Sequence, residues 1–112
     1  MPLTPFNPVI DTVTIGGRPF TLSALPSGIV RYQLLPLADA VADGTRTIQE
    51  AFDDMLLHVV DSLSRVDGSI TKDDVLNGCS LYEVCTLFKH VIRVSGLQSK
   101  EPSEGEAEGA KS

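Results

Sequence analysis

Residues 47–63, TIQEAFDDMLLHVVDSL, are the most strongly patterned stretch of this 112-residue chain. Thr47 and Glu50 have the spacing of a capping box, in which each side chain accepts a hydrogen bond from a backbone N–H at the start of a helix. Apolar residues then recur at steps of three and four positions, as on one face of a helix. They are Ile48, Phe52, Met55, Leu56, Val59, Val60 and Leu63. We therefore expect a helix over residues 47–65 that buries this stripe and exposes an acidic face carrying His58.

Two more helix starts follow downstream. Thr71, with Asp74 three positions later, is expected to cap the start of a short helix, and Ser80 with Glu83 forms a second full capping box. The helices are expected over residues 71–77 and 80–95. The apolar positions of the last helix are Leu81, Val84, Cys85, Leu87, Phe88, Val91 and Ile92.

A proline interrupts the apolar run upstream of residue 47. Ser27 is the expected N-cap of a helical segment over residues 27–43, and Asp43-Gly44 is its expected end. Pro36 lies inside this segment, where it removes one backbone N–H and its ring crowds the preceding turn. The sequence predicts a helix kinked near Pro36, with two shorter helices as the alternative.

Residues 9–25 have the alternating pattern of a β-hairpin. Val13 and Ile15 alternate with threonines, and Phe20 and Leu22 resume the alternation after Gly16-Gly17. Two consecutive glycines supply the positive φ angles of a two-residue turn. Pro19 lacks an N–H, so its strand is expected at an edge of the sheet or bonded on one side only.

These elements predict an α+β, mainly α fold: an N-terminal hairpin followed by a small bundle of three to four helices in one domain over residues 9–97. Residues 1–8 contain three prolines and are expected to form an extended arm. Residues 98–112 contain no apolar residue larger than alanine. Such a segment buries too little surface to offset the entropy of ordering, so an acidic, disordered tail is expected.

The charge of the chain excludes several classes of partner. The formal net charge is −6, and the nine Lys and Arg residues are scattered along the sequence. Nucleic acid and anionic membranes both require concentrated basic surface, so neither is expected. The sequence has no apolar run long enough to span a membrane and no secretory signal, and we expect a soluble cytoplasmic protein. Cys79 and Cys85 are interpreted as lying on different faces of one helical segment, which argues against a disulfide.

Three clusters of polar residues are candidates for a metal site or a catalytic site. Asp67-Gly68-Ser69-Ile70 with Asp74 resembles half of a calcium loop, but the first two oxygen ligands are missing. His58 between Asp54 and Asp61 has the spacing of a general base, but no nucleophile lies in a recognisable motif, so an exposed histidine beside acids is expected. A zinc site would need Cys79, Cys85, His58 and His90, whose spacings match no known pattern. No enzymatic activity, cofactor or metal is therefore expected.

Three short motifs lie in the hairpin, before the first helix and at the end of the last helix. Residues 13–22 read VTIGGRPFTL, residues 24–28 read ALPSG, and the last helix closes with VSGL at 94–97. This order of hairpin, helix, amphipathic helix and last helix, covering about residues 9–97, resembles the tail assembly chaperones of long-tailed bacteriophages. The motifs are short and degenerate, so the order of the elements carries most of the resemblance.

The resemblance implies a non-enzymatic protein of the infected bacterial cytoplasm. Such a chaperone coats the tape measure protein, helps recruit tail tube subunits and is absent from the finished virion. The family also implies a possible partner in a longer, frameshifted form of the same chain, and a homo-oligomer remains open. The tape measure protein is expected to be long, helical and rich in apolar residues, so acidic helical domains would both cover it and repel one another.

Surplus apolar residues of the hairpin and of the kinked segment are the hypothetical partner surface. They are Ile15, Phe20, Leu22, Ile29, Leu34, Leu35 and Leu37. The alternative is that all seven close the domain's own core. A rival function is a small structural head-tail connector, or another protein that works by stoichiometric contact. A connector would remain in purified particles, whereas a chaperone would not.

Overall fold

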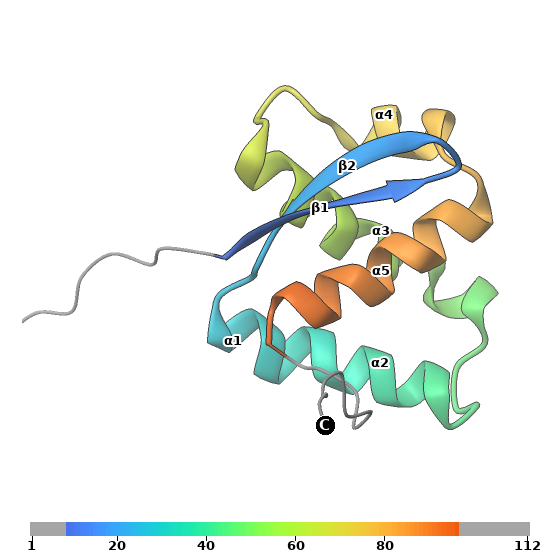
Figure 1. Cartoon of the computed structure of the whole chain (residues 1–112). Coiled ribbons are helices and arrows are strands. Elements are labelled where there is room, and N and C mark those ends of the chain that lie inside the picture. The colour runs from blue at the N-terminus through green and yellow to red at the C-terminus, as the bar shows by residue number, and fades with distance from the viewer. Residues whose placement is uncertain (1–8, 97–112) are drawn as a thin grey trace, which may run out of the picture.

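The structure is a computed structural model that describes residues 9–96. An antiparallel hairpin is followed by helices, which confirms the predicted fold class. The elements are β1 (Ile10–Ile15), β2 (Arg18–Ser23), α1 (Ser27–Ile29), the π-helical turn η1 (Val30–Leu34), α2 (Leu35–Ala42), α3 (Ile48–Val66), α4 (Lys72–Gly78) and α5 (Leu81–Val94). Figure 1 shows the hairpin on one side of α5 and the α1–α2 segment on the other.

Two predicted segments lie outside the described residues. They are the N-terminal arm over residues 1–8 and the acidic tail over residues 98–112. Within residues 9–96, no helix is long and apolar enough to cross a membrane.

The hairpin turns at Gly16-Gly17, as predicted. Both glycines have positive φ angles, 60° and 81°, which a two-residue turn needs in order to match the twist of the strands. The register places Ile15 opposite Arg18 beside the turn. Side chains alternate between the two faces, and the face that carries Ile15 and Leu22 is buried against the helices.

Helix α3 is central, because it contacts β2, α2, α4 and α5. Its capping box forms as predicted: the Glu50 N–H donates to Thr47 Oγ1 (3.1 Å), and the Thr47 N–H donates to Glu50 Oε1 (2.9 Å). Ile48, the first member of the predicted apolar stripe, is exposed instead at the first position of the helix. The buried residues of α3 are Ala51, Met55, Leu56, His58, Val59, Ser62 and Leu63.

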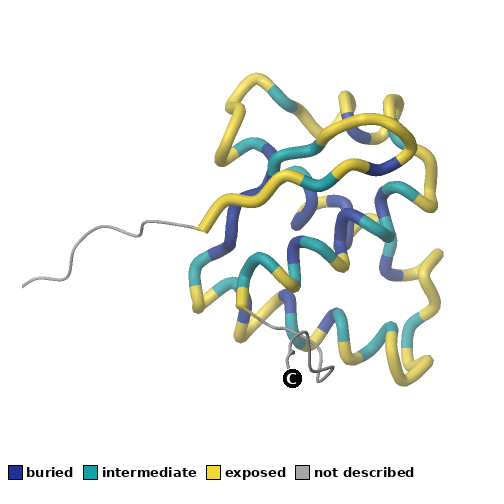
Figure 2. Tube along the Cα trace, in the orientation of Figure 1, coloured by how far each residue is buried: buried dark blue, intermediate teal, exposed yellow. Residues whose placement is uncertain are grey.

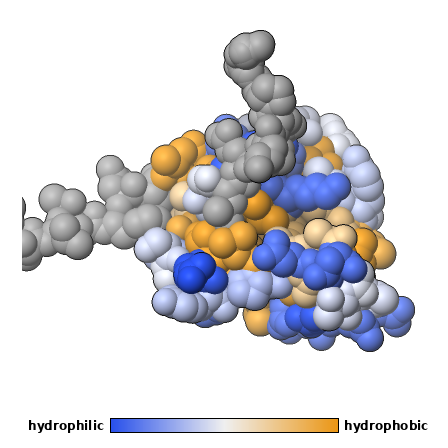
Figure 3. Space-filling model, turned by 90° about the horizontal axis from the view of Figure 1, so that it is seen from below, coloured by the Kyte–Doolittle hydropathy of each residue, from blue (hydrophilic) through white to orange (hydrophobic). Residues whose placement is uncertain are grey.

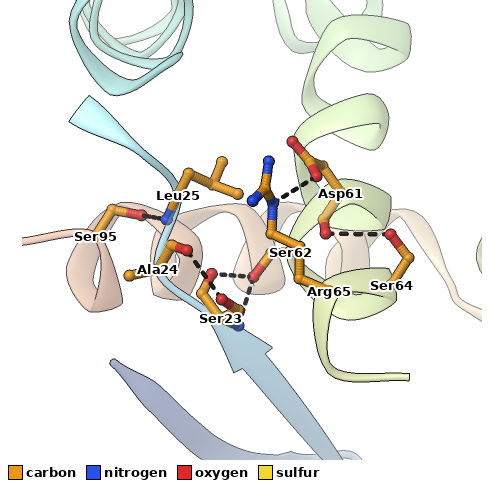
Figure 4. A network of polar contacts seen from close by, with 8 residues as sticks. All are labelled: Ser23, Ala24, Leu25, Asp61, Ser62, Ser64, Arg65 and Ser95. Carbon is orange, nitrogen blue, oxygen red and sulfur yellow. Dashed lines mark hydrogen bonds and ion pairs between the residues drawn. The ribbon is translucent and has the colours of Figure 1, made fainter. Parts of the chain in front are cut away.

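A buried hydroxyl joins α3 to the end of β2 (Figure 4). Ser62 Oγ accepts a hydrogen bond from the Ser23 N–H (2.9 Å) and donates one to the Ser23 carbonyl (2.7 Å). Two residues after Ser23, the Leu25 N–H donates a hydrogen bond to Ser95 Oγ (3.0 Å), and Ser95 directly follows α5. These side chains satisfy backbone groups that have no strand partner where the chain leaves the hairpin.

The proline in the segment before α3 is accommodated by a π turn. In a regular helix, the ring of Pro36 would collide with the carbonyl of Tyr32, four residues earlier. In η1, the N–H of Leu35 donates to the carbonyl of Val30, five residues earlier, so the helix is locally wider. The segment is therefore helical from Ser27 to Ala42 without the break of the alternative prediction, and η1 is what accommodates Pro36.

The predicted N-cap of this segment is wrong. Pro26 occupies the capping position in an extended conformation, and no side chain there forms a capping hydrogen bond. Ser27 is already helical, since the chain enters the helix directly after Pro26.

Helix α5 begins at the predicted capping box of Ser80 with Glu83, and α4 begins at the predicted cap Thr71, which forms a full capping box with Asp74. Arg18 reaches their junction from the hairpin turn: its Nη2 donates to the Gly78 carbonyl (2.7 Å) and to Glu83 Oε1 (2.9 Å). The same guanidinium lies 5.2 Å from the centre of the Phe20 ring.

The interpretation of the two cysteines is corrected in part. Cys79 ends α4 and does not share a helix with Cys85, which lies in α5, because Gly78 closes one helix and Ser80 caps the next. Both thiols are free and partly buried.

One hydrophobic core holds these elements together. Figure 2 shows the buried positions, in dark blue, on the sides of the elements that face one another. The largest fully buried apolar side chains come from β2, η1, α3 and α5: Leu22, Leu34, Leu56, Val59, Leu87, Val84 and Val91.

Candidate functional site

A groove of about 440 Å³ lies between the η1–α2 segment and α3. One wall comes from Gln33 of η1 and from Pro36, Leu37 and Ala40 of α2. The other wall comes from Arg46, before α3, and from Asp54, Leu57, His58 and Asp61 of α3. The groove is open to solvent, and its lining mixes apolar side chains with polar and ionic ones.

The α3 wall is a second helical stripe beside the one that fills the core. Asp54, Leu57, His58 and Asp61 follow at steps of three, one and three positions, so they share one face of the helix. The η1–α2 segment lies against this face, and the core stripe faces elsewhere. The groove therefore follows from where the π-helical segment packs on α3.

His58 is buried, which corrects the expectation of an exposed histidine. Its exposed fraction is 8%, because the wall formed by η1 and α2 covers this part of α3. Burial lowers the pKa of His58, and the charges of Asp61 and Asp54 oppose this shift without reversing it. The imidazole is consequently uncharged at neutral pH and contributes a polar but neutral surface to the groove.

The two aspartates on either side of His58 are each paired with an arginine. Asp54 Oδ2 lies 3.0 Å from Arg46 Nη1, and Asp61 Oδ1 lies 2.8 Å from Arg65 Nε. The second of these pairs is drawn in Figure 4. Both pairs are partly exposed and add little to stability, but they compensate the carboxylate charge beside the groove.

Leu57 is an exposed apolar side chain of the groove. It is 53% exposed, whereas Leu37 on the opposite wall is buried. Figure 3 views the molecule from the side of the α1–α2 segment, where hydrophobic surface lies between hydrophilic residues. An apolar surface with a polar border can receive side chains from a partner.

The seven residues predicted to bind a partner do not form one exposed surface. Ile15, Leu22, Leu34 and Leu37 are buried in the domain's own core. Phe20, Ile29 and Leu35 are partly buried, and the first two pack against that core. Of the seven, only Leu37 lines the groove.

Sequence reasoning missed most of the groove. Leu57, Pro36 and Gln33 were not among the predicted partner residues, although the three-four spacing of Leu57 with Asp54 and Asp61 is visible in the sequence. That spacing was interpreted as a solvent-facing acidic side, since the position of the η1–α2 segment cannot be read from α3 alone.

The carboxylates of the rejected calcium loop have local partners. Asp67 Oδ1 accepts hydrogen bonds from the Ser69 N–H (3.0 Å) and hydroxyl (2.6 Å), and these bonds lower the pKa of Asp67. Asp74 Oδ2 accepts from the Thr71 N–H (2.8 Å) at the start of α4. Within residues 9–96, no three His, Cys, Asp or Glu side chains form a group that could hold a metal ion.

Comparison with known proteins adds no identification: no protein-family model, curated protein or solved structure matches this chain.

Proposed function

We propose that this chain is a non-enzymatic tail assembly chaperone of a long-tailed bacteriophage. It binds the tape measure protein through the groove between η1–α2 and α3, and it helps recruit tail tube subunits. It acts in the cytoplasm of the bacterial host and is absent from the finished virion. The order of hairpin and helices, together with the motifs at residues 13–22, 24–28 and 94–97, supports this family.

The groove is the observation that carries the proposal. Pro36, Ala40 and the exposed Leu57 offer apolar contact, and the neutral His58 imidazole and two paired aspartates line the same groove. A partner helix that presents apolar side chains three and four positions apart can place them in such a groove. A long helical tape measure protein supplies many such faces, so one small domain can bind repeatedly along it.

The charge of the chain suits a protein that coats another. Its formal net charge is −6, so a partner coated with many copies becomes strongly negative, and coated complexes repel one another through the solvent. This repulsion opposes aggregation of an apolar-rich partner once it is covered.

Co-expression with the tape measure protein of the same phage tests the proposal. We expect wild type to be captured by the tagged tape measure protein, and Leu57→Asp to lower the captured amount at least about tenfold, since a charge is introduced where an apolar contact forms. Leu76→Asp is the matched control, because Leu76 is 44% exposed and does not line the groove. Circular dichroism shows whether both variants stay folded.

Two results would count against the proposal. Capture of folded Leu57→Asp at the wild-type level would exclude the groove as the binding site. Stoichiometric recovery of the chain from purified virions by mass spectrometry would favour a structural connector instead.

Leu34→Asp is unsuitable for this test. Leu34 is 0% exposed, so an aspartate there would bury an unpaired charge and unfold the domain. A loss of capture in that variant would report on folding and not on binding.

A further inference from the structure

The two outer edges of the hairpin differ in what their backbone groups can bind. Ile15 and Arg18 flank a two-residue turn, so they form a hydrogen-bonded pair, and the pairs then alternate along the ladder. The backbone groups of Ile10, Thr12 and Thr14 consequently point away from β2. On β2, those of Pro19, Thr21 and Ser23 point away from β1 in the same way.

The outer edge of β2 is closed at both ends. Pro19 has no N–H to donate. Ser23 uses its outward N–H and carbonyl in the two hydrogen bonds to Ser62 Oγ. An added strand would find neither end of this edge free.

Within residues 9–96, the outer edge of β1 is open. Ile10 is 55% exposed, and Thr12 and Thr14 are also exposed. No residue among 9–96 forms a hydrogen bond with the outward backbone groups of these three. The sequence of β1, IDTVTI, has five β-branched residues and a single charge, without the Lys or Pro that commonly protects an edge strand.

We propose that this edge pairs with the same edge of a second copy of the chain. A two-fold axis at Thr12 joins the two hairpins into one four-stranded antiparallel sheet. Thr12 then lies opposite Thr12 of the second copy, and Ile10 lies opposite Thr14. Each Thr12 and each Thr14 directs its backbone donor and acceptor at the other copy.

The side chains of β1 fit this register. Within each hairpin, Thr12 Oγ1 already lies 3.0 Å from Thr21 Oγ1 on the outer face. The dimer extends this pair into a row of four threonines across the sheet, a cross-strand arrangement that favours pairing. Asp11 lies opposite Val13 of the second copy, so the two carboxylates do not face each other directly.

These side-chain pairs also favour a second copy of the chain over an unrelated strand at this edge. The threonine row and the Ile10–Thr14 pairs arise only when the added strand has the sequence of β1. An isologous contact of this kind also closes on itself, so pairing ends at the dimer and does not continue as a fibre.

Charged substitutions of Thr12, which lies on the two-fold axis, test the proposed dimer register. Sedimentation of the full chain over a range of concentrations should show a monomer–dimer equilibrium. Thr12→Lys and Thr12→Glu should each weaken it at least about tenfold, because each places two like charges opposite one another. An equimolar mixture of the two variants should recover dimerisation to within about threefold of wild type, since opposite charges then meet at the axis.

Thr21→Lys is the matched control. It removes the same Thr12–Thr21 contact and adds the same charge to the same face, but one strand away from the axis. It should change the dissociation constant by less than about threefold. Hydrogen exchange on wild type gives a second readout: the amides of Thr12 and Thr14 should become protected as the protein concentration rises.

The proposal is overturned by any of four results. These are a wild type that stays monomeric, a mixture that associates no better than the single variants, a Thr21→Lys variant as weak as Thr12→Lys, or a dimer in which the Thr12 and Thr14 amides remain unprotected. Protection that develops only when another protein is added would assign the edge to that protein instead.

Discussion

Ser62 and Ser64 lie two positions apart on α3 and carry the same hydroxyl, yet their environments differ. Ser62 is fully buried and binds both backbone groups of Ser23. Ser64 Oγ only donates to the Asp61 carbonyl within its own helix (3.2 Å). The contribution of a serine to stability here therefore depends on which backbone groups its hydroxyl binds, and not on the residue type alone.

Replacing these serines should separate the two roles. Ser62→Ala leaves a buried N–H and a buried carbonyl without partners, and we expect a loss of about 2 to 3 kcal/mol in the free energy of unfolding. Ser64→Ala should cost about 0.5 kcal/mol or less, because the carbonyl of Asp61 keeps its place in the helix. Urea denaturation of the two variants measures both values, and equal losses would contradict the role assigned to Ser62.

At the scale of the elements, the sequence predicts those turns and helix starts that depend only on residues close together in the chain. The hairpin turn at Gly16-Gly17 and the three capped helix starts depend on residues at most three positions apart, and all four were predicted. The π turn was not, since a proline can be accommodated by a kink, a break or a wider turn. Ser27 was misassigned because Pro26 satisfies the geometry of helix entry without a side-chain hydrogen bond.

Glu50 and Glu83 hold the same capping position, but only Glu83 also binds the hairpin. Glu83 accepts from the Ser80 N–H (2.8 Å) and from Arg18 Nη2 (2.9 Å), so its removal affects both α5 and the contact with the turn. We expect Glu83→Ala to lower the melting temperature more than Glu50→Ala. Calorimetry on both variants, with Arg18→Met to isolate the hairpin contact, checks the order. Equal shifts would mean that the Arg18 contact is energetically neutral.

At the scale of the whole molecule, the two proposed surfaces lie on different elements. The groove is formed by η1, α2 and α3, and the open strand edge is formed by β1. The groove could not be predicted from the sequence, because it depends on how two helical segments meet. His58 illustrates this: Asp54 and Asp61, about one helical turn away on either side, are acidic, and its burial comes from residues about twenty positions earlier in the chain.

Stability should depend on pH near neutrality through the histidines. Burial lowers the pKa of His58 and also that of His90, where Arg93 adds to the effect. Below about pH 6.5, the unfolded chain therefore binds more protons than the folded one, so the free energy of unfolding falls as the pH falls toward each folded pKa. The hydrogen-bonded carboxylates of Asp43 and Asp67, whose pKa values are also lowered, act in the same direction at lower pH.

Urea denaturation between pH 7.5 and about pH 5 measures this dependence. His58→Gln should flatten the curve by the part that His58 contributes, and His90→Gln serves as the comparison at a less buried site. An unchanged slope in His58→Gln would show that the imidazole is not held uncharged in the groove.

The π turn also has a consequence for how the length of this chain can vary. A π turn contains one residue more than the α-helical turn that it replaces, while the helix on either side keeps its rotational phase. Loss of one residue from Val30–Leu34, together with replacement of Pro36, would restore a regular helix and leave Leu37 facing inward. The same deletion in α3 would rotate all later residues by about 100° and displace both of its stripes. Gaps between this chain and its evolutionary relatives should therefore be accepted in η1 and rejected in α3.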